Sequence, residues 1–354
     1  MPQAVKAMPA KIRVVIADDS TLTRELLRAL LQEEDDIDVV GEAANGREAL
    51  DQVRRLRPDV LTLDIIMPIM PGPQAIREIM AVCPLPILVL SSVADAKNAF
   101  DCIQGGALDV VMKPLFNASS GAELARRIRV LAKTRVMRHW SMLRPSSTTQ
   151  PPLEARGTTD LHKQPFHRVF AIAASTGGPQ ALAAILPSLP AHFPCPVVVA
   201  QHVALGFAQG MVDWLSSLCP MPVHLVNQTV PLQAGHIYIA PPERNLCINR
   251  QQHLILEEQM PGDIFHPNCD CLLHSVAEVC GAQAVGIILS GMSSDGAKGI
   301  ARIRQRGGVT LAQDEASSVI FGMNRVAIES GAVQQVLPVT AIADSMQKLA
   351  GKST

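Results

Sequence analysis

Short apolar runs alternate with segments of helical spacing through most of this 354-residue chain. Helical segments such as residues 21–33 and 46–55 separate the runs in the first third of the sequence. The runs there are residues 12–17, 39–42, 60–63, 87–90 and 109–112. Strands that alternate with helices are joined by crossover connections, which produce a parallel sheet covered by helices on both faces. This alternation restricts the fold to the α/β class.

The same alternation occurs twice, on either side of a stretch that has no periodicity. Residues 144–152 are rich in Pro, Ser and Thr and cannot bury a core. Further apolar runs then occur at residues 169–174, 196–200, 236–240 and 284–290, with a helical segment at 179–186 and a region richer in strands and turns at 232–260. A chain of this length is also too long for one typical core. We therefore predict two doubly wound parallel-sheet domains, residues 11–133 and 167–350, joined by a flexible linker at residues 134–166.

Composition excludes several classes of protein. The formal net charge of −1 argues against a nucleic-acid binder, which would carry a basic excess. No apolar stretch reaches the length of a membrane span, and the first ten residues lack the apolar core of a signal peptide. The eight cysteines include no C-x-x-C pair and are expected to be reduced thiols. We expect a cytoplasmic protein that is not membrane-inserted.

Charged and hydroxyl side chains stand where the runs of the first block end. Asp18 and Asp19 follow the first run, Asp64 ends the third, Ser91 the fourth and Lys113 the fifth. The carboxyl ends of parallel strands meet at one edge of the sheet, where ligands bind. Clustered carboxylates repel one another unless a cation such as Mg²⁺ lies among them. A helix cap or a surface charge explains any one of these residues equally well, but not five residues at four strand ends.

With these residues in place, residues 11–133 resemble the receiver domain of two-component response regulators, a flavodoxin-like fold. The resemblance implies that a histidine kinase donates a phosphoryl group to Asp64. The matched residues are Asp18, Asp19, Asp64 and the backbone carbonyl of Ile66 for Mg²⁺, with Ser91 and Lys113 for the phosphate. Val110 stands where receivers usually carry a switch aromatic. The resemblance therefore predicts the phosphorylation but not the side chain that carries the signal out of the pocket.

Three residues of the second block could form a hydrolytic site. Ser175 lies between an apolar run and a glycine turn, His202 follows the next run, and Asp295 precedes Gly296 and another helical segment. A histidine can remove the serine proton, an aspartate can orient that histidine, and backbone amides can stabilise an oxyanion. The order Ser, His, Asp and the absence of a G-x-S-x-G turn make the usual hydrolase folds poor comparisons.

Each of these residues also has a structural explanation. The turn at residues 175–178 could bind a phosphate at a helix N-terminus. His202 could be one of ten satisfied histidines, and Asp295 with Gly296 could form only a turn.

A competing metal site lies further along the chain, in a segment with five potential ligands. These ligands are His266, Cys269, Asp270, Cys271 and His274. Cysteine and histidine are good zinc ligands, but a second ligand pair at finger-like spacing is missing. On a helix, Cys271 and His274 share a face while Cys269 points elsewhere. We therefore favour a helix that contributes thiols to the core.

Residues 168–345 resemble the catalytic domain of the chemotaxis protein-glutamate methylesterase and glutamine deamidase family, a Rossmann-like α/β domain. The matching motifs are residues 174–179, 201–202, 288–297 and 312–318. The resemblance implies that Ser175 is the nucleophile, His202 the base and Asp295 the residue that orients it. It also implies that Thr176 and the backbone of Met292 shape the site, and that the ester step needs no cofactor.

Together the two resemblances predict a phosphorylation-activated esterase. It would hydrolyse glutamyl methyl esters on methylated chemoreceptors, release methanol, and deamidate receptor glutamines. A histidine kinase would supply the phosphate. The alternative is a non-enzymatic response regulator whose output domain binds a partner or a phosphorylated ligand. A DNA-binding output has little support, because the second block shows no helix-turn-helix pattern.

Overall fold

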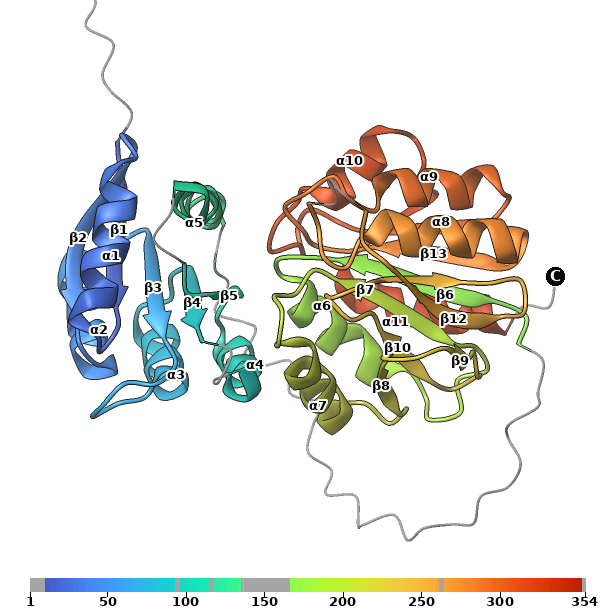
Figure 1. The fold of residues 1–354 in the computed structure, drawn as a ribbon, viewed down its shortest axis with the longest axis horizontal. Coiled ribbons are helices and arrows are strands. Elements are labelled where there is room, and N and C mark those ends of the chain that lie inside the picture. Colours follow the sequence, from blue (N-terminus) through green and yellow to red (C-terminus); the bar gives the residue numbers. More distant parts are fainter. Residues whose placement is uncertain are drawn as a thin grey trace, which may run out of the picture. The chain divides into compact units, whose positions relative to one another are not determined.

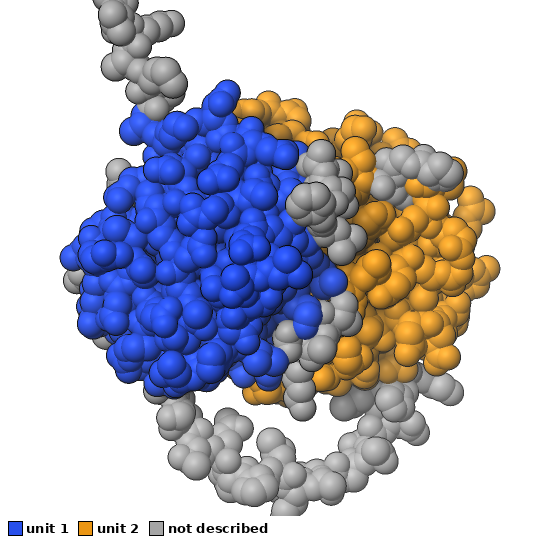
Figure 2. Space-filling model, turned by 60° about the vertical axis from the view of Figure 1, so that its left-hand side comes forward, with its two compact units in different colours: residues 1–141 blue, residues 142–354 orange. Residues whose placement is uncertain are grey.

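A computed structural model of the chain describes residues 10–92, 96–114, 118–134, 136, 166–260 and 264–351. The chain divides into two compact units, residues 1–141 and 142–354 (Figure 2). This division falls inside the predicted linker at residues 134–166. Of that segment only residues 134, 136 and 166 are described, so the predicted linker itself lies outside the described residues.

The first unit contains a five-stranded parallel sheet in the order β2-β1-β3-β4-β5 (Figure 1). Its elements are β1 (Ile12–Ala17), α1 (Thr21–Gln32), β2 (Ile37–Ala43), α2 (Gly46–Leu56), β3 (Val60–Asp64), α3 (Gly72–Val82), β4 (Ile87–Ser91), α4 (Ala96–Gly105), β5 (Asp109–Met112) and α5 (Ala118–Leu131). Helices α1 and α5 pack together, as do α2, α3 and α4 in succession. All five apolar runs predicted from the sequence are strands of this sheet.

Local sequence explains where the helices of this unit begin. Ser20 precedes α1 and accepts the amide hydrogen of Thr23 at 3.3 Å. Asn45 caps α2 in the same way, by accepting the amide hydrogen of Glu48. Such side chains satisfy amides that have no partner in the first helical turn. The central strands β3 and β4 are buried along their whole length, as expected for a sheet covered on both faces.

The second unit contains a seven-stranded parallel sheet in the order β15-β14-β13-β6-β7-β10-β8. The strands of this sheet are β6 (Val169–Ala174), β7 (Val197–Gln201), β8 (Val223–Leu225), β10 (Ile237–Ile239), β13 (Ala284–Ile288), β14 (Val309–Gln313) and β15 (Gln335–Leu337). The parallel α/β architecture predicted for both blocks is therefore confirmed. The sequence did not identify β8, β14 or β15, of which β8 and β15 are three-residue strands at the two edges.

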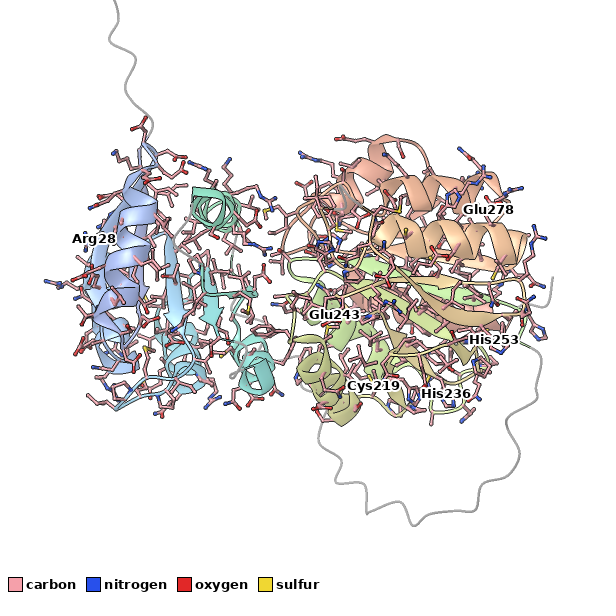
Figure 3. The ribbon with its side chains drawn as sticks, in the orientation of Figure 1. Arg28, Cys219, His236, Glu243, His253 and Glu278 are labelled. Carbon is pink, nitrogen blue, oxygen red and sulfur yellow. The ribbon has the colours of Figure 1, made fainter. Side chains whose placement is uncertain are left out.

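Helices cover both faces of this second sheet. Figure 1 shows α8, α9 and α10 over one face and α6, α7 and α11 over the other. The helical elements are α6 (Gly178–Ile185), the 3₁₀ turn η3 (Leu186–Ser188), α7 (Ala208–Leu218), α8 (Cys269–Cys280), the 3₁₀ turn η4 (Gly281–Gln283), α9 (Ala297–Gln305), α10 (Met323–Glu329) and α11 (Val339–Ala350). Glu278 of α8 pairs with Arg302 and Arg306 across the α8–α9 contact, at the periphery of the unit (Figure 3).

A small antiparallel sheet lies in the region predicted to be rich in strands and turns. It consists of β9 (Val230–Pro231), β11 (Asn245–Ile248) and β12 (His253–Glu257) in the order β11-β12-β9. Strand β11 packs against α8. Of the helices in the described ranges, none combines the length and the apolar composition that crossing a bilayer requires.

Candidate active site and phosphorylation pocket

The chain order of the second sheet reverses at its first strand. Strand β6 lies between β7 and β13, so the crossovers leave it in opposite directions. Ligands bind beyond the carboxyl ends of the strands at such a switch point. Ser175, His202 and Asp295 follow β6, β7 and β13 respectively. The topology therefore brings together three residues that are far apart in the sequence.

The three side chains form a continuous hydrogen-bonded series. His202 Nδ1 lies 3.1 Å from Ser175 Oγ, and His202 Nε2 lies 2.7 Å from Asp295 Oδ2. Ser175 and Asp295 are buried, and the side chain of His202 retains 13% of its exposure. The series has the connectivity of a nucleophile, a base and a residue that orients the base.

The orientation of the imidazole assigns its tautomer. An ionised carboxylate only accepts hydrogen bonds, so Nε2 carries the hydrogen that faces Asp295. Nδ1 is then left with a lone pair that faces the hydroxyl of Ser175. In the catalytic triad of chymotrypsin-like serine proteases, Nε2 faces the serine instead. In this chain Nδ1 is the atom that can take the serine proton.

The N-terminus of α8 holds the carboxylate of Asp295. Its Oδ2 accepts the amide hydrogen of Cys269 at 2.7 Å, and its Oδ1 accepts that of Asp270 at 2.9 Å. Burial opposes the charge, but the hydrogen bond and charge of His202 and the two amides lower the pKa of Asp295 below its ordinary value. Helix N-termini favour negative charge for the same reason. Asn268 caps α8 by accepting the amide of Cys271 at 2.9 Å.

Ser290 connects the loops that carry the nucleophile and the aspartate. Its Oγ donates to the carbonyl of Thr176 at 2.8 Å and accepts the amide of Ile320 at 2.9 Å. Its carbonyl accepts the amide of Ser175 at 3.0 Å. Thr176 is buried, and Met292 is half-buried in the loop after β13. Within the described part of the chain, the amide of Met292 has no protein acceptor, so it is available to a ligand.

Two further contacts of His202 were not predicted from the sequence. The ring of Phe265 stacks on the imidazole with centroids 5.1 Å apart and planes 4° apart. The thiol of Cys269 lies 3.4 Å from Nε2 and donates to the carbonyl of Ala200 at 3.3 Å. Both residues come from the segment that precedes and begins α8. Only the position of that helix in the fold brings them to the histidine.

The competing metal site is not assembled. Cys269 faces the triad, while the side chain of His274 is 60% exposed near Glu278. Over the described ranges, two groups of potential ligands come within 4.8 Å of one another, and neither contains His266, Cys271 or His274. One of these groups is His202, Cys269 and Asp295, whose atoms are already engaged in the contacts above. The segment begins helix α8, as the sequence favoured, and of its two cysteines Cys269 is buried in the core and Cys271 is half-buried.

The second group of potential ligands lies in the first unit, at the switch point between β1 and β3. Oxygen atoms of Asp18, Asp19 and Asp64 lie within 4.8 Å of one another. Lys113 Nζ is 2.8 Å from Asp18 Oδ2 and 2.8 Å from Asp64 Oδ2. Burial and the neighbouring charge of Asp18 outweigh this lysine and raise the pKa of Asp64. Although burial opposes its charge, the two carboxylates raise the pKa of Lys113.

The remaining predicted residues of the pocket also lie at this edge of the sheet. Ser91 is buried at the end of β4 and donates to the carbonyl of Ser92 at 3.1 Å. Asp19 and Ile66 are exposed in the loops that follow β1 and β3. Val110 is half-buried in β5, paired with Val89 of β4. The five residues found at four strand ends are thus gathered at one edge, as the topology predicted.

Comparison with known proteins relates both units to described families. Residues 170–346 match the CheB methylesterase family, and residues 14–136 match the response regulator receiver domain. Protein-glutamate methylesterase/protein-glutamine glutaminase 3 of Paramagnetospirillum magneticum is 47% identical over 360 residues, covering 98% of this chain and 99% of that protein. The protein of the same name from Myxococcus xanthus is 39% identical, covering 94% and 92%. The crystal structure of the Thermotoga maritima CheB methylesterase catalytic domain aligns with a TM-score of 0.50 and 32% identity, covering 51% of this chain and 98% of that one.

Proposed function

Since this chain belongs to the CheB methylesterase family and carries a response regulator receiver domain ahead of its catalytic domain, we propose that it is a phosphorylation-regulated protein-glutamate methylesterase and protein-glutamine glutaminase in chemotaxis. The observation that carries the proposal is the hydrogen-bonded series from Ser175 through His202 to Asp295. A non-enzymatic output domain has no need of such a series. The names of the relatives also favour the enzyme over that alternative.

In the proposed reaction, Ser175 Oγ attacks the side-chain carbonyl carbon of a glutamyl methyl ester. His202 Nδ1 takes the hydroxyl proton, and Asp295 stabilises the imidazolium that forms. The tetrahedral adduct then expels methanol, which receives the proton from Nδ1. Water attacks the acyl-serine, again with Nδ1 as base, and releases the glutamate carboxylate. A glutamine side chain would follow the same course and release ammonia.

The developing oxyanion needs hydrogen-bond donors, and the chain offers them around Ser175. We assign the backbone amide of Met292 to this role, because it has no protein acceptor among the described residues. Thr176, directly after the proposed nucleophile, would help to shape the site. Donors already fixed in place stabilise an oxyanion without reorganising during the reaction. The ester step requires no cofactor in this scheme.

The receiver pocket is proposed to regulate this reaction. The clustered carboxylates of Asp18, Asp19 and Asp64 suit Mg²⁺, and the backbone carbonyl of Ile66 would be a further ligand. Bound Mg²⁺ would neutralise the negative charge of an incoming phosphoryl group. Asp64 would accept that group, which must displace the ammonium of Lys113 from its carboxylate. Lys113 and Ser91 would then bind the phosphate oxygens.

The same proposal defines the partners of the protein. A histidine kinase would supply the phosphoryl group, and methylated chemoreceptors would be the substrates. Because such a kinase takes its phosphate from ATP, the proposal places the protein in the cytoplasm.

Methanol release from methylated receptors tests the proposed function. The full-length protein with Mg²⁺ should release methanol, and a small-molecule phosphodonor such as acetyl phosphate should increase the rate. Mass spectrometry of the receptor should show methyl ester replaced by carboxylate at the same positions. Tight binding of the receptor without any methanol release would favour the non-enzymatic alternative.

A further inference from the structure

We propose that Gln201 is a positioning residue. The nitrogen of its buried side-chain amide holds the main chains of Ser175, the nucleophile, and His202, the base, beside each other. The inference rests on the proposed function. Gln201 is the last residue of β7 and is only 2% exposed. Its Nε2 donates to the carbonyl of Ser175 at 2.8 Å and to the carbonyl of His202 at 2.9 Å.

The amide extends the pairing of β6 and β7 beyond the point where the strands end. The last backbone hydrogen bond between these chains runs from the amide of His202 to the carbonyl of Ala174 at 2.9 Å. Beyond it, the chain after Ser175 turns into α6 and the chain after His202 enters a loop. The side chain of Gln201 replaces the next backbone contact. It therefore acts on the two residues whose separation determines proton transfer.

The chemistry of the partners fixes which way the amide points. Both partners are carbonyl oxygens, so the NH₂ group must face them and Oε1 must face away. Oε1 lies against the first turn of α6, where a Cβ on Gly178 would come within 1.9 Å of it. Among the described residues, Oε1 has no hydrogen-bond partner. The two donors are therefore the part of the side chain that the site uses.

Loss of these donors should affect the reaction more than binding of the substrate. The carbonyl of Ser175 would keep the amide of Gly178, which it accepts at 2.7 Å, but its link to the histidine would be lost. A displacement of about 1 Å between reacting groups can cost about 10²-fold in rate. We therefore expect kcat to fall while KM changes little.

The test compares Gln201→Met with Thr310→Val in the full-length protein. Methionine keeps the length of the side chain and removes both donors. Thr310 is the matched control, because it is also buried in the sheet and its Oγ1 donates to the carbonyl of Ala332 at 2.7 Å. Both variants should melt at a lower temperature than the parent. Only Gln201→Met should lose kcat per folded molecule, by about 10 to 10²-fold, with KM within about twofold of the parent.

A second variant gives a readout that a purely structural role would not change. Gln201→Glu places carboxylate oxygens against two carbonyl oxygens, so it should be less active than Gln201→Met at neutral pH. Protonation restores one donor, so the ratio of its kcat to that of the parent should rise as the pH falls. A flat ratio, or a kcat of Gln201→Met equal to that of Thr310→Val, would overturn the proposal.

Labelling of Ser175 by a fluorophosphonate separates this proposal from the proposed function. The labelling rate reports the nucleophile and the base without requiring a receptor. If the parent is labelled at Ser175 but releases no methanol, the proposed substrate is wrong. The positioning role of Gln201 is then decided by whether Gln201→Met is labelled about 10-fold or more slowly than the parent.

Discussion

Replacement of Asp295 by asparagine should inactivate the catalytic unit through the tautomer of His202. The carboxylate has two acceptor oxygens, and all three of its partners are donors. Oδ2 accepts His202 Nε2–H and the amide of Cys269, both at 2.7 Å, while Oδ1 accepts the amide of Asp270 at 2.9 Å. An asparagine amide has one acceptor oxygen and one NH₂ group, so it cannot satisfy all three donors.

The magnitude follows from the two ways in which the amide can point. If the NH₂ group faces Asp270, a buried N–H loses its acceptor, which costs about 1–3 kcal/mol of stability. If it faces His202, the amide of Cys269 loses its acceptor and Nε2 must accept. The hydrogen then moves to Nδ1, where it faces Ser175 and removes the base. In serine proteases, inversion of the histidine tautomer costs about 10⁴-fold in kcat. This corresponds to about 5 kcal/mol on the barrier.

The assay measures the rate of methanol release from methylated receptors by Asp295→Asn. It is combined with ¹⁵N NMR of the histidine side chains, which reports the tautomer. We expect kcat to fall by about 10⁴-fold and the hydrogen of His202 to be found on Nδ1. Asp270→Asn is the matched control, because its Oδ1 accepts the amide of Gly299 at 2.7 Å and an amide oxygen can replace it. A loss below about tenfold in Asp295→Asn, with the tautomer unchanged, would refute the reasoning.

Three further predictions concern the switch and the turn of the nucleophile. Asp64→Asn should keep basal turnover and lose stimulation by acetyl phosphate; undiminished stimulation would mean that phosphate acts elsewhere. Because its folded pKa is raised, Asp64 contributes stability below its ordinary pKa of 3.8 that is lost as the pH rises through the folded value. Without Mg²⁺, Asp64→Asn should therefore raise the melting temperature of the first unit at neutral pH, which calorimetry would detect. A lower melting temperature would contradict a raised pKa of Asp64. Gly177→Ala adds a Cβ 2.4 Å from the Cβ of Val319 at a residue with φ +79°. Chemical denaturation should show that it loses more free energy of unfolding than the roughly 1–2 kcal/mol expected for Gly331→Ala, whose φ is +74° and whose surroundings are open. Equal losses in the two variants would rule out the clash with Val319.

Residues at strand ends were predictable because topology alone places them. Ser175, His202 and Asp295 each follow an apolar run, and parallel strands deliver such residues to a common edge. The same rule located Asp64 and Lys113 in the first unit. No knowledge of side-chain contacts is needed for this step, since strands that alternate with helices run parallel in one sheet.

Contacts made by backbone amides could not be predicted. The amides of Cys269 and Asp270 hold the carboxylate of Asp295, but any residue type except proline carries an amide hydrogen, so no side-chain pattern marks it. The same segment was a competing candidate for a metal site because its cysteines, histidines and aspartate are close in sequence. In the fold these side chains point to different places, because Cys269 contacts His202 while His274 is exposed near Glu278.

Long-range polar contacts were equally hidden. Asn324 is fully buried. Its side-chain amide donates to the carbonyl of Gln313 at 2.9 Å and to Ser318 Oγ at 2.7 Å. Gln313 in turn accepts the amide of Ser290, which supports the turn of the nucleophile. Only the fold shows that this asparagine, in the first turn of α10, holds the end of β14 and the loop that follows it.

The central claim is that Ser175 performs the hydrolysis, and one comparison tests it most directly. Methanol release from methylated receptors is measured for the parent and for Ser175→Ala, both with Mg²⁺ and acetyl phosphate. Removal of a nucleophile that acts as a unit with its base should lower turnover by about 10⁶-fold. Release by Ser175→Ala at a rate close to that of the parent would contradict the account.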